Sequence, residues 1–326
     1  MNVEEITLDE KQQQIIEGKR FPKVLEATGN PSLEDAIEWV KENKQSLEND
    51  LQNHGAFIVR NFPIHKIQEF HDFLISFGWN HDVQYTGGGG PRNIVLGPIY
   101  NSTDSPPEFI IPFHHEMAYL SKFPQKLIFY CDIEPAENGE TPILISNEII
   151  KAIREKNADF IDAIQQKGIR YIRTLCDKNV GGESLQYQKS WQDIFQTTEK
   201  EKAEELAKSC GTETIEWNDD GSMKLTTIKF DGIVTEERTK KETWFNAVCL
   251  LHPAAHKGKN TPWDVVYGDF TPLKDEDVIM AKDILQSLGV KPKWKQGDMM
   301  VVDNRLALHA RNIFTPPRRI LAAFAE

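Results

Sequence analysis

The first third of the chain alternates helix-forming and strand-forming patterns. From Ser32 to Gly55 apolar residues recur every three or four positions, between a serine suited to cap a helix and a glycine suited to end one. The segment AFIVR at 56–60, apolar at its first four positions, is typical of a buried strand, and a second amphipathic helix is predicted after Pro63. Residues 1–30, in contrast, are predicted to be a loosely attached lead-in.

The rest of the chain combines strands with an inserted helical region. Residues 147–211 are predicted to be largely helical, interrupted by a strand at 169–173, and a further helix is predicted at 274–288. Strand-like runs are predicted at 126–132, at 141–146, within 212–250, after the turn at Gly297 and Asp298, and at the end of the chain.

This order of elements indicates one domain, residues 31–326, of mixed α and β class. A doubly wound sheet would alternate strand and helix, and this chain does not. In a jelly-roll barrel, strands from distant parts of the sequence meet across the fold. The pattern therefore predicts a double-stranded β-helix (jelly-roll) core with flanking helices and the helical insertion at 147–211.

Composition narrows the classes of partner. The chain has 326 residues, 39% of them hydrophobic, which is enough for a sizeable core. Its formal net charge of -12 argues against nucleic acid or an anionic membrane as partner. A small anionic substrate stays possible, because a few local arginines can hold one in a cleft.

Cysteine usage and the first residues indicate the compartment. The four cysteines are scattered and form no CxxC pair, so neither a zinc ribbon nor a disulfide framework is expected. The first 14 residues are polar and acidic, unlike a signal peptide, and no apolar run is long enough to span a bilayer. We expect a soluble protein of the cytoplasm.

The candidate chemistry begins in FHHEMAYL, residues 113–120. On an extended segment side chains alternate faces, so His114 and Glu116 point the same way and His115 points the other way. The helical zinc-protease pattern HExxH would need a histidine where Tyr119 stands. We therefore interpret His114 and Glu116 as a ligand pair, and His115 as a packing or supporting residue.

A third ligand is predicted near the end of the chain. His309 follows a predicted strand in DNRLALH, residues 303–309. Two histidines and one carboxylate on one side of a metal leave the other positions open, as in non-haem Fe(II) oxygenases. A 2-oxo acid would occupy two of these positions and O₂ the third.

The distal carboxylate of such a co-substrate needs a cationic partner. Arg318 and Arg319 begin the last predicted strand, and arginine binds carboxylates through two parallel hydrogen bonds. Because strand side chains alternate, only one of the two is expected to point into the barrel. Thr141 is a candidate hydroxyl donor to the same carboxylate.

These motifs together resemble one known family. HxE at 114–116, GET at 139–141, DNRLALH and the arginine pair are similar in type and order to the taurine dioxygenase/clavaminate synthase-like Fe(II)/2-oxoglutarate oxygenases. The resemblance runs from about residue 55 to the end. It implies a jelly-roll fold, the cofactors Fe(II), 2-oxoglutarate and O₂, and oxidation of a C–H bond in an amino acid or related small metabolite.

The resemblance also implies a role for each matching residue. His114, Glu116 and His309 match the metal ligands, and Thr141 matches the threonine that contacts 2-oxoglutarate. Arg319 matches its arginine partner, with Arg318 as the second choice. Glutamate in the triad is typical of the clavaminate synthase-like branch, and it argues against a halogenase, which has a small residue there.

Two substrate contacts are predicted on weaker grounds. Asn246 lies in ETWFNAV, which resembles a segment that borders the cleft in relatives, although a core strand explains it equally well. Arg92 follows the glycine run at 87–90, which lacks the context of a phosphate loop and is interpreted as a lid near the site; a solvated arginine is the simpler explanation.

Two other functional classes remain open from the sequence. A zinc-dependent hydrolase could use the same three ligands, but it would not need Thr141 and an arginine on the closing strand. A non-catalytic jelly-roll binding protein would tolerate the loss of Glu116 or His309, and both are present.

Overall fold

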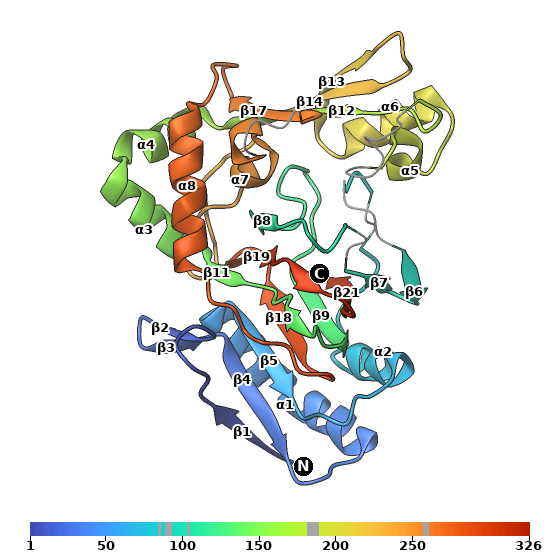
Figure 1. The fold of residues 1–326 in the computed structure, drawn as a ribbon, viewed down its shortest axis with the longest axis vertical. Coiled ribbons are helices and arrows are strands. Elements are labelled where there is room, and N and C mark those ends of the chain that lie inside the picture. Colours follow the sequence, from blue (N-terminus) through green and yellow to red (C-terminus); the bar gives the residue numbers. More distant parts are fainter. Residues whose placement is uncertain (84–85, 89–92, 103–104, 181–188, 257–260) are drawn as a thin grey trace.

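Two β-sheets face each other at the centre of the molecule (Figure 1). The structure, a computed structural model, describes residues 1–83, 86–88, 93–102, 105–180, 189–256 and 261–326. The larger sheet has the strand order β1 (Asn2–Ile6), β4 (Lys23–Thr28), β5 (Ala56–Arg60), β18 (Met299–Asp303), β9 (Lys126–Ile133), β21 (Arg319–Ala325), β7 (Ile99–Asn101) and β6 (Ile94–Leu96). The smaller sheet has the order β11 (Ile143–Ile145), β19 (Ala307–Arg311) and β8 (Ile111–His114).

Neighbouring strands of both sheets come from distant parts of the chain. β18 pairs with β5 on one side and β9 on the other, and β19 lies between β11 and β8. Such pairing between the beginning, middle and end of the chain is the jelly-roll arrangement that the sequence predicts.

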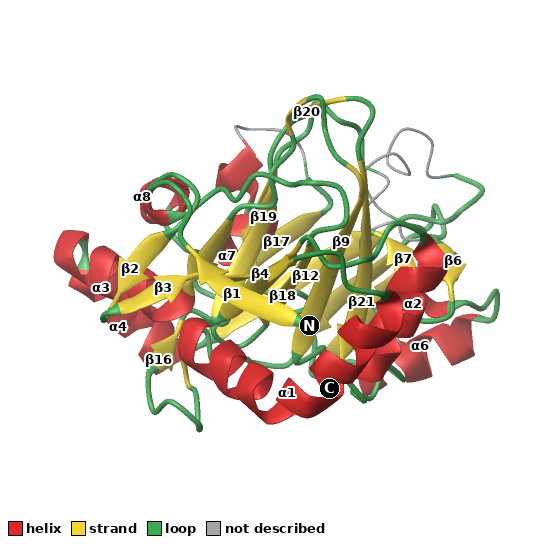
Figure 2. Cartoon of the chain, turned by 90° about the horizontal axis from the view of Figure 1, so that it is seen from below, coloured by secondary structure: helices red, strands yellow, loops and turns green. Residues whose placement is uncertain are grey.

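Side-chain alternation separates the barrel interior from its outer face. In β21, Ile320 and Phe324 pack between the sheets, whereas Leu321 and Ala323 pack on the opposite side. That opposite side is covered by α1 (Leu33–His54) and α2 (Ile67–Ser76), which lie along the large sheet in Figure 2. The interior face of β21 therefore carries the even-numbered residues.

The predicted first helix is confirmed with its caps. The Ser32 hydroxyl accepts from the Asp35 backbone N–H at 3.1 Å, and the Asp35 carboxylate accepts from the Ser32 backbone N–H at 2.9 Å. The helix ends at Gly55, whose φ of 71° suits glycine. Both cap signals were readable from the sequence because they are local.

The inserted region and a third sheet form a second layer above the small sheet. The helices are α3 (Ser146–Lys156), α4 (Ala158–Lys167), α5 (Trp191–Phe195), α6 (Lys200–Ser209), α7 (Val248–Leu251), the 3₁₀ turn Pro253–His256 and α8 (Asp275–Leu288). The third sheet has the order β13 (Thr212–Trp217), β14 (Met223–Thr227), β12 (Ile169–Leu175) and β17 (Trp263–Tyr267). The two-stranded pairs are β2 (Gln14–Ile16) with β3 (Lys19–Phe21), β10 (Glu137–Asn138) with β20 (Phe314–Thr315), and β15 (Val234–Thr235) with β16 (Glu242–Thr243).

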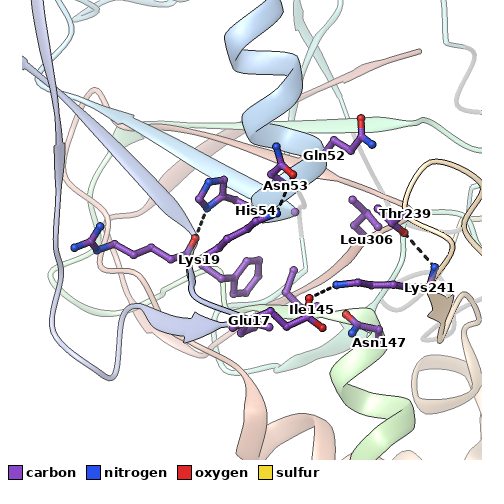
Figure 3. A pocket seen from close by; sticks show the side chains of 14 residues that line it. Glu17, Lys19, Gln52, Asn53, His54, Ile145, Asn147, Thr239, Lys241 and Leu306 are labelled. Carbon is purple, nitrogen blue, oxygen red and sulfur yellow. Dashed lines mark hydrogen bonds and ion pairs between the residues drawn. The ribbon is translucent and has the colours of Figure 1, made fainter.

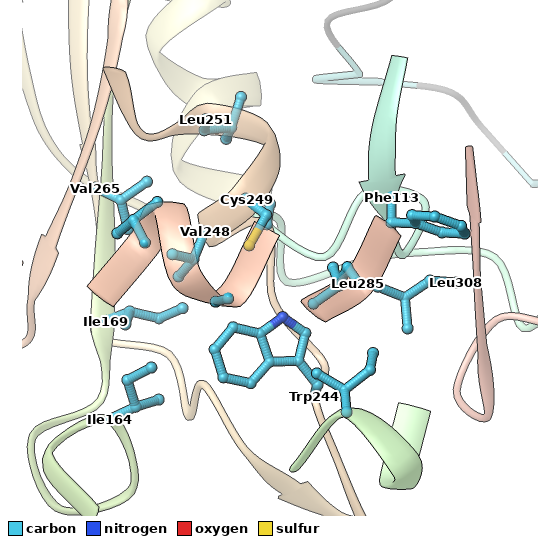
Figure 4. Packing of buried hydrophobic residues seen from close by; sticks show 14 of the residues in the cluster. Phe113, Ile164, Ile169, Trp244, Val248, Cys249, Leu251, Val265, Leu285 and Leu308 are labelled. Atoms are coloured by element: carbon cyan, nitrogen blue, oxygen red, sulfur yellow. The ribbon is translucent and has the colours of Figure 1, made fainter. Parts of the chain in front are cut away.

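One apolar core joins this second layer to the small sheet. Trp244, 1% exposed, lies at its centre among side chains from the helices and from β8 and β19 (Figure 4). Phe113 of β8 and Leu308 of β19 belong to this core, so these strands bury both of their faces. Residues 114 and 309 are consequently directed to the other face, into the barrel.

Two expectations about local structure are wrong. The lead-in at 1–30 contains β1 and β4, which are paired strands of the large sheet; β1 reads as polar because most of its side chains are exposed. The strand-like run ETWFNAVCL is extended only at Glu242–Thr243 and then turns into α7. At β1 the backbone pairing with β4 overrides the local pattern, and at α7 the packing of buried side chains does so.

In the described part of the chain, no helix has the length and apolar character needed to cross a bilayer.

Candidate active site

Two histidines that are far apart in the sequence are paired across strands. His114 ends β8, and its direct partner in the ladder with β19 is His309. Their ring centroids lie 4.2 Å apart, and the His309 ring lies 5.2 Å from that of Phe129 on the barrel wall. Strand pairing thus places both imidazoles side by side inside the barrel.

A carboxylate completes the cluster. Glu116 follows the end of β8, and its Oε2 lies 3.6 Å from Nε2 of His309. The candidate ligand atoms of His114, Glu116 and His309 all lie within 4.8 Å of one another, and all three residues are buried. The grouping is the one predicted, but Glu116 reaches it from a turn, not from an extended strand.

One buried amide holds that turn in place. The Asn304 Oδ1 accepts from the backbone N–H of Glu116 at 2.8 Å, and its Nδ2 donates to the carbonyls of Glu116 at 3.0 Å and Pro124 at 2.8 Å. Asn304 is fully buried and lies in the turn that leads into β19. It therefore ties the carboxylate ligand to the strand that carries His309.

The hydrogen bond of His114 orients its ring. Its Nδ1 lies 2.8 Å from the carbonyl oxygen of Pro112, and because a carbonyl only accepts, Nδ1 carries the proton. A metal would then be bound through Nε2. Such hydrogen bonds to the second ring nitrogen are typical of metal-binding histidines.

His115 is directed away from the cluster, as predicted. Its Nδ1 donates to the carbonyl of Asn304 at 2.5 Å, and its Nε2 accepts from the Ser146 hydroxyl at 3.0 Å. Burial lowers the pKa of His115 to about 3, so the ring is neutral and both nitrogens are already bonded. It supports the turn and has no lone pair left for a metal.

A cationic group and a hydroxyl meet at the other end of the barrel interior. Arg318 donates through Nε to the carbonyl of Gly139 at 2.8 Å and through a terminal nitrogen to the Thr141 hydroxyl at 3.4 Å. Thr141 is 4% exposed and also accepts from the indole N–H of Trp294 at 3.2 Å. Thr141 and one arginine of the pair are thus brought together as predicted.

The structure reverses the expected order of the two arginines. Arg319 lies on the outer face of β21, donates to the Asp132 carboxylate at 3.2 Å, and its side chain is 40% exposed. Arg318 directly precedes β21, and its bonds to Gly139 and Thr141 direct its side chain inward. The spacing between the last histidine and the arginine in the family did not predict which of the two arginines turns inward.

The two weaker substrate predictions receive no support. Asn246 is 1% exposed; its Nδ2 donates to the Gly232 carbonyl at 2.7 Å and its Oδ1 accepts from the Val248 backbone N–H at 3.0 Å, so both ends of its amide are bonded to the protein backbone. Arg92 lies outside the described residues.

Sequence reasoning missed Asn304 and Trp294 as parts of the site. Asn304 stands inside the DNRLALH motif, and that position was the available signal. Trp294 precedes the Gly297 turn with no motif around it, so only the contact with Thr141 reveals it.

A separate surface pocket lies between the β2–β3 hairpin, the end of α1 and residues 239–241 (Figure 3). Two of its lysines are already bonded: Lys241 to the Glu17 carboxylate, and Lys19 to the side-chain oxygen of Asn53 at 2.9 Å. None of its lining residues belongs to the histidine–carboxylate cluster.

Comparison with known proteins defines the class. The sequence profile described as "Taurine catabolism dioxygenase TauD, TfdA family" matches residues 19–324. A clavaminate synthase-like protein of Arabidopsis thaliana is 33% identical over 322 residues, covering 97% of this chain and 96% of that protein. The dapdiamide synthesis protein DdaC of Enterobacter agglomerans is 28% identical over 294 residues, covering 86% of this chain and 84% of its own.

Solved structures agree on the fold. PvcB of Pseudomonas aeruginosa matches with a TM-score of 0.54 at 12% identity, over 99% of this chain and 90% of that chain. A taurine dioxygenase of Burkholderia xenovorans matches with a TM-score of 0.53 at 12% identity, over 96% of this chain and 88% of that chain.

The fold and the family together define an Fe(II)/2-oxoglutarate-dependent dioxygenase. This chain belongs to the TauD/TfdA family, and its cofactors are Fe(II), 2-oxoglutarate and O₂. The residues present fit the metal: two neutral imidazoles and one carboxylate suit Fe(II) and leave positions open for co-substrates. The family match does not favour a zinc hydrolase or a non-catalytic binding protein.

The contacts of Asn304 lead to a first prediction. In Asn304→Ala the turn that carries Glu116 loses two buried bonds to its backbone, and the bond to Pro124 is lost with them. The Kd for Fe(II) should therefore rise about 10- to 100-fold. Titration of the metal-depleted protein with Fe(II) or Mn(II) measures this. Asn43→Ala, which removes one amide–carbonyl bond within α1, is the control. An unchanged metal affinity in folded Asn304→Ala would contradict the positioning role.

Proposed function

We propose that this protein hydroxylates an unactivated C–H bond of an amino acid or a related small metabolite. In this proposal His114, Glu116 and His309 bind the iron, and Arg318 with Thr141 holds the distal carboxylate of 2-oxoglutarate. The observation that carries it is the meeting of two imidazoles and one carboxylate within 4.8 Å inside a barrel that also presents an inward arginine.

The side chains divide the work between binding and orientation. Bound Fe(II), with 2-oxoglutarate and O₂, supplies the oxidising power for the C–H bond as 2-oxoglutarate is converted to succinate and CO₂. His114 and His309, fixed by the β8–β19 ladder, would supply two ligands to the metal. Glu116 lowers the charge of the site, and Asn304 keeps that carboxylate in position.

The co-substrate end is organised by a separate set of bonds. Thr141 receives the Trp294 N–H, so its own hydroxyl proton can be directed to a carboxylate. Arg318 is anchored by the Gly139 carbonyl through Nε, which leaves its terminal nitrogens to form charge-assisted bonds. The apolar residues between the sheets exclude water from the site.

Support for a small substrate comes from the class and its relatives. One relative is named for dapdiamide synthesis, and taurine dioxygenases are among the structural neighbours. The net charge of -12 disfavours nucleic acid as a substrate.

The test is succinate release from 2-oxoglutarate against a panel of amino acids and small organic acids. We expect one compound to raise the rate at least about tenfold over the substrate-independent background and to gain one oxygen atom from O₂ by mass spectrometry. A product lacking two hydrogens would indicate desaturation, and oxygen added across a double bond would indicate epoxidation. Hydrolysis of a substrate with zinc, without consumption of 2-oxoglutarate, would refute the proposal.

A further inference from the structure

A second arginine lies inside the barrel close to the co-substrate end. Arg311 is on β19 two residues after His309, so both side chains leave the same face of the strand. Arg311 is 5% exposed. None of the roles assigned to the site so far uses this buried cation.

The bonds of Arg311 satisfy its two terminal nitrogens but do not neutralise its charge. Its terminal nitrogens donate to the carbonyls of Ser105 at 2.8 Å, Pro106 at 2.6 Å and Phe109 at 2.7 Å. Its Nε has no hydrogen-bond partner. An arginine guanidinium keeps its proton at neutral pH in proteins, so Arg311 is a cation.

Arg311 and Arg318 share one aromatic ring. The guanidinium carbon of Arg311 lies 5.4 Å from the centre of the Phe314 ring, and that of Arg318 lies 5.2 Å from it. Burial, and after it the charge of Arg311, lowers the pKa of Arg318 to about 10, so the two cations act on each other.

No carboxylate compensates this pair within the described residues. Neither arginine forms an ion pair there, and the acidic groups that act on them, Glu108 and Glu140, do so from beyond ion-pair distance. Two like charges in a water-poor interior are costly unless an anion joins them. The enzyme's own co-substrate is a dianion, and its second carboxylate is the anion that this end of the barrel receives.

We propose that Arg311 is a second cationic residue of the co-substrate pocket, and that it makes the pocket selective for 2-oxo acids with a distal carboxylate. This inference rests on the proposed function, in which Arg318 and Thr141 contact that carboxylate. Arg311 acts as a positioning residue. Its positive charge attracts the distal carboxylate of the co-substrate across the Phe314 ring, and the three carbonyl bonds hold the Arg311 side chain in place.

The competing explanation is purely structural. Arg311 would then only fasten residues 105–109 to β19, and its loss would loosen the pocket for every co-substrate alike. Charge selectivity separates the two explanations, because a fastening role does not depend on whether the ligand carries a second carboxylate.

The experiment is equilibrium binding to the Mn(II)-loaded protein, measured by calorimetry without turnover. The ligands are 2-oxoglutarate and 2-oxopentanoate, which has the same chain length and lacks the distal carboxylate. We expect Arg311→Gln to weaken 2-oxoglutarate about tenfold and to change 2-oxopentanoate by less than about twofold. Arg319→Gln, at the exposed neighbour of Arg318, is the matched control and should leave both affinities unchanged.

Each outcome decides the inference. Equal weakening of both ligands in Arg311→Gln, or unchanged selectivity, overturns it and leaves the proposed function intact. If the wild-type protein with metal binds no 2-oxoglutarate, both fail. Should Arg311→Gln not fold, Arg311→Lys decides instead: it keeps the charge without the three-carbonyl geometry, so retained selectivity supports the inference and lost selectivity refutes it.

Discussion

Replacing His309 by alanine should abolish iron binding, whereas replacing the buried His115 should not. His309 faces His114 across the β8–β19 ladder and lies 3.6 Å from the Glu116 carboxylate. Supporting residues around metal sites contribute 10- to 100-fold to affinity, so removal of a ligand should weaken Fe(II) binding by more than about a hundredfold. Turnover of 2-oxoglutarate should fall to background with it.

The measurement is anaerobic addition of Fe(II) and 2-oxoglutarate, followed by the weak visible charge-transfer band and by metal content after desalting. His115→Gln is the control, because both nitrogens of His115 bond to protein groups. This variant should unfold at a lower temperature but retain the band. A normal band in His309→Ala, or its loss only in His115→Gln, would show that the wrong imidazole has been assigned.

Replacing Arg318 by alanine should raise the KM for 2-oxoglutarate about a hundredfold, while Arg319→Ala should change it by less than about twofold. Truncating one partner of a buried charge-assisted pair costs about 2–5 kcal/mol, but an exposed ion pair contributes about 0–1 kcal/mol. Arg318 is directed to Thr141 in the barrel, and Arg319 to Asp132 on the outside.

These adjacent arginines provide their own control, since the two variants remove the same side chain from neighbouring positions of one strand. Steady-state succinate release at varied 2-oxoglutarate measures the effect, and the iron affinity of both variants should stay at the wild-type level. If Arg319→Ala were the impaired variant, Arg319 would be the arginine that binds 2-oxoglutarate, as the resemblance to the family implies. The assignment of Arg318 to this role would then be contradicted.

The difference between these arginines shows where sequence reasoning ends. The sequence predicts that one of Arg318 and Arg319 enters the barrel, because strand side chains alternate. Which one enters depends on the pairing of β21 with β9, and that ladder has an irregularity between Arg319 and Ile320. The sequence spacing between His309 and the arginine pair does not predict such a shift in strand pairing.

The orientation of Glu116 is a second feature that the sequence did not predict. The HxE pattern assumes an extended segment, but β8 ends at His114 and the next residues form a turn. Glu116 still reaches the metal site because Asn304, far away in sequence, binds its backbone on both sides. The grouping of His114, Glu116 and His309 was predictable, but the interaction that orients Glu116 was not.

The sequence by itself determined the class of fold, the first helix with both of its caps, and the residue types that can bind iron and a dicarboxylate. These features depend on local periodicity, capping and side-chain chemistry, which the chain carries wherever it folds. Only the tertiary structure decided that β1 and β4 join the large sheet, that Arg318 is the inward arginine, and that Asn304 binds the backbone of Glu116. These follow from strand register and burial between segments distant along the chain, and such contacts leave no local pattern in the sequence.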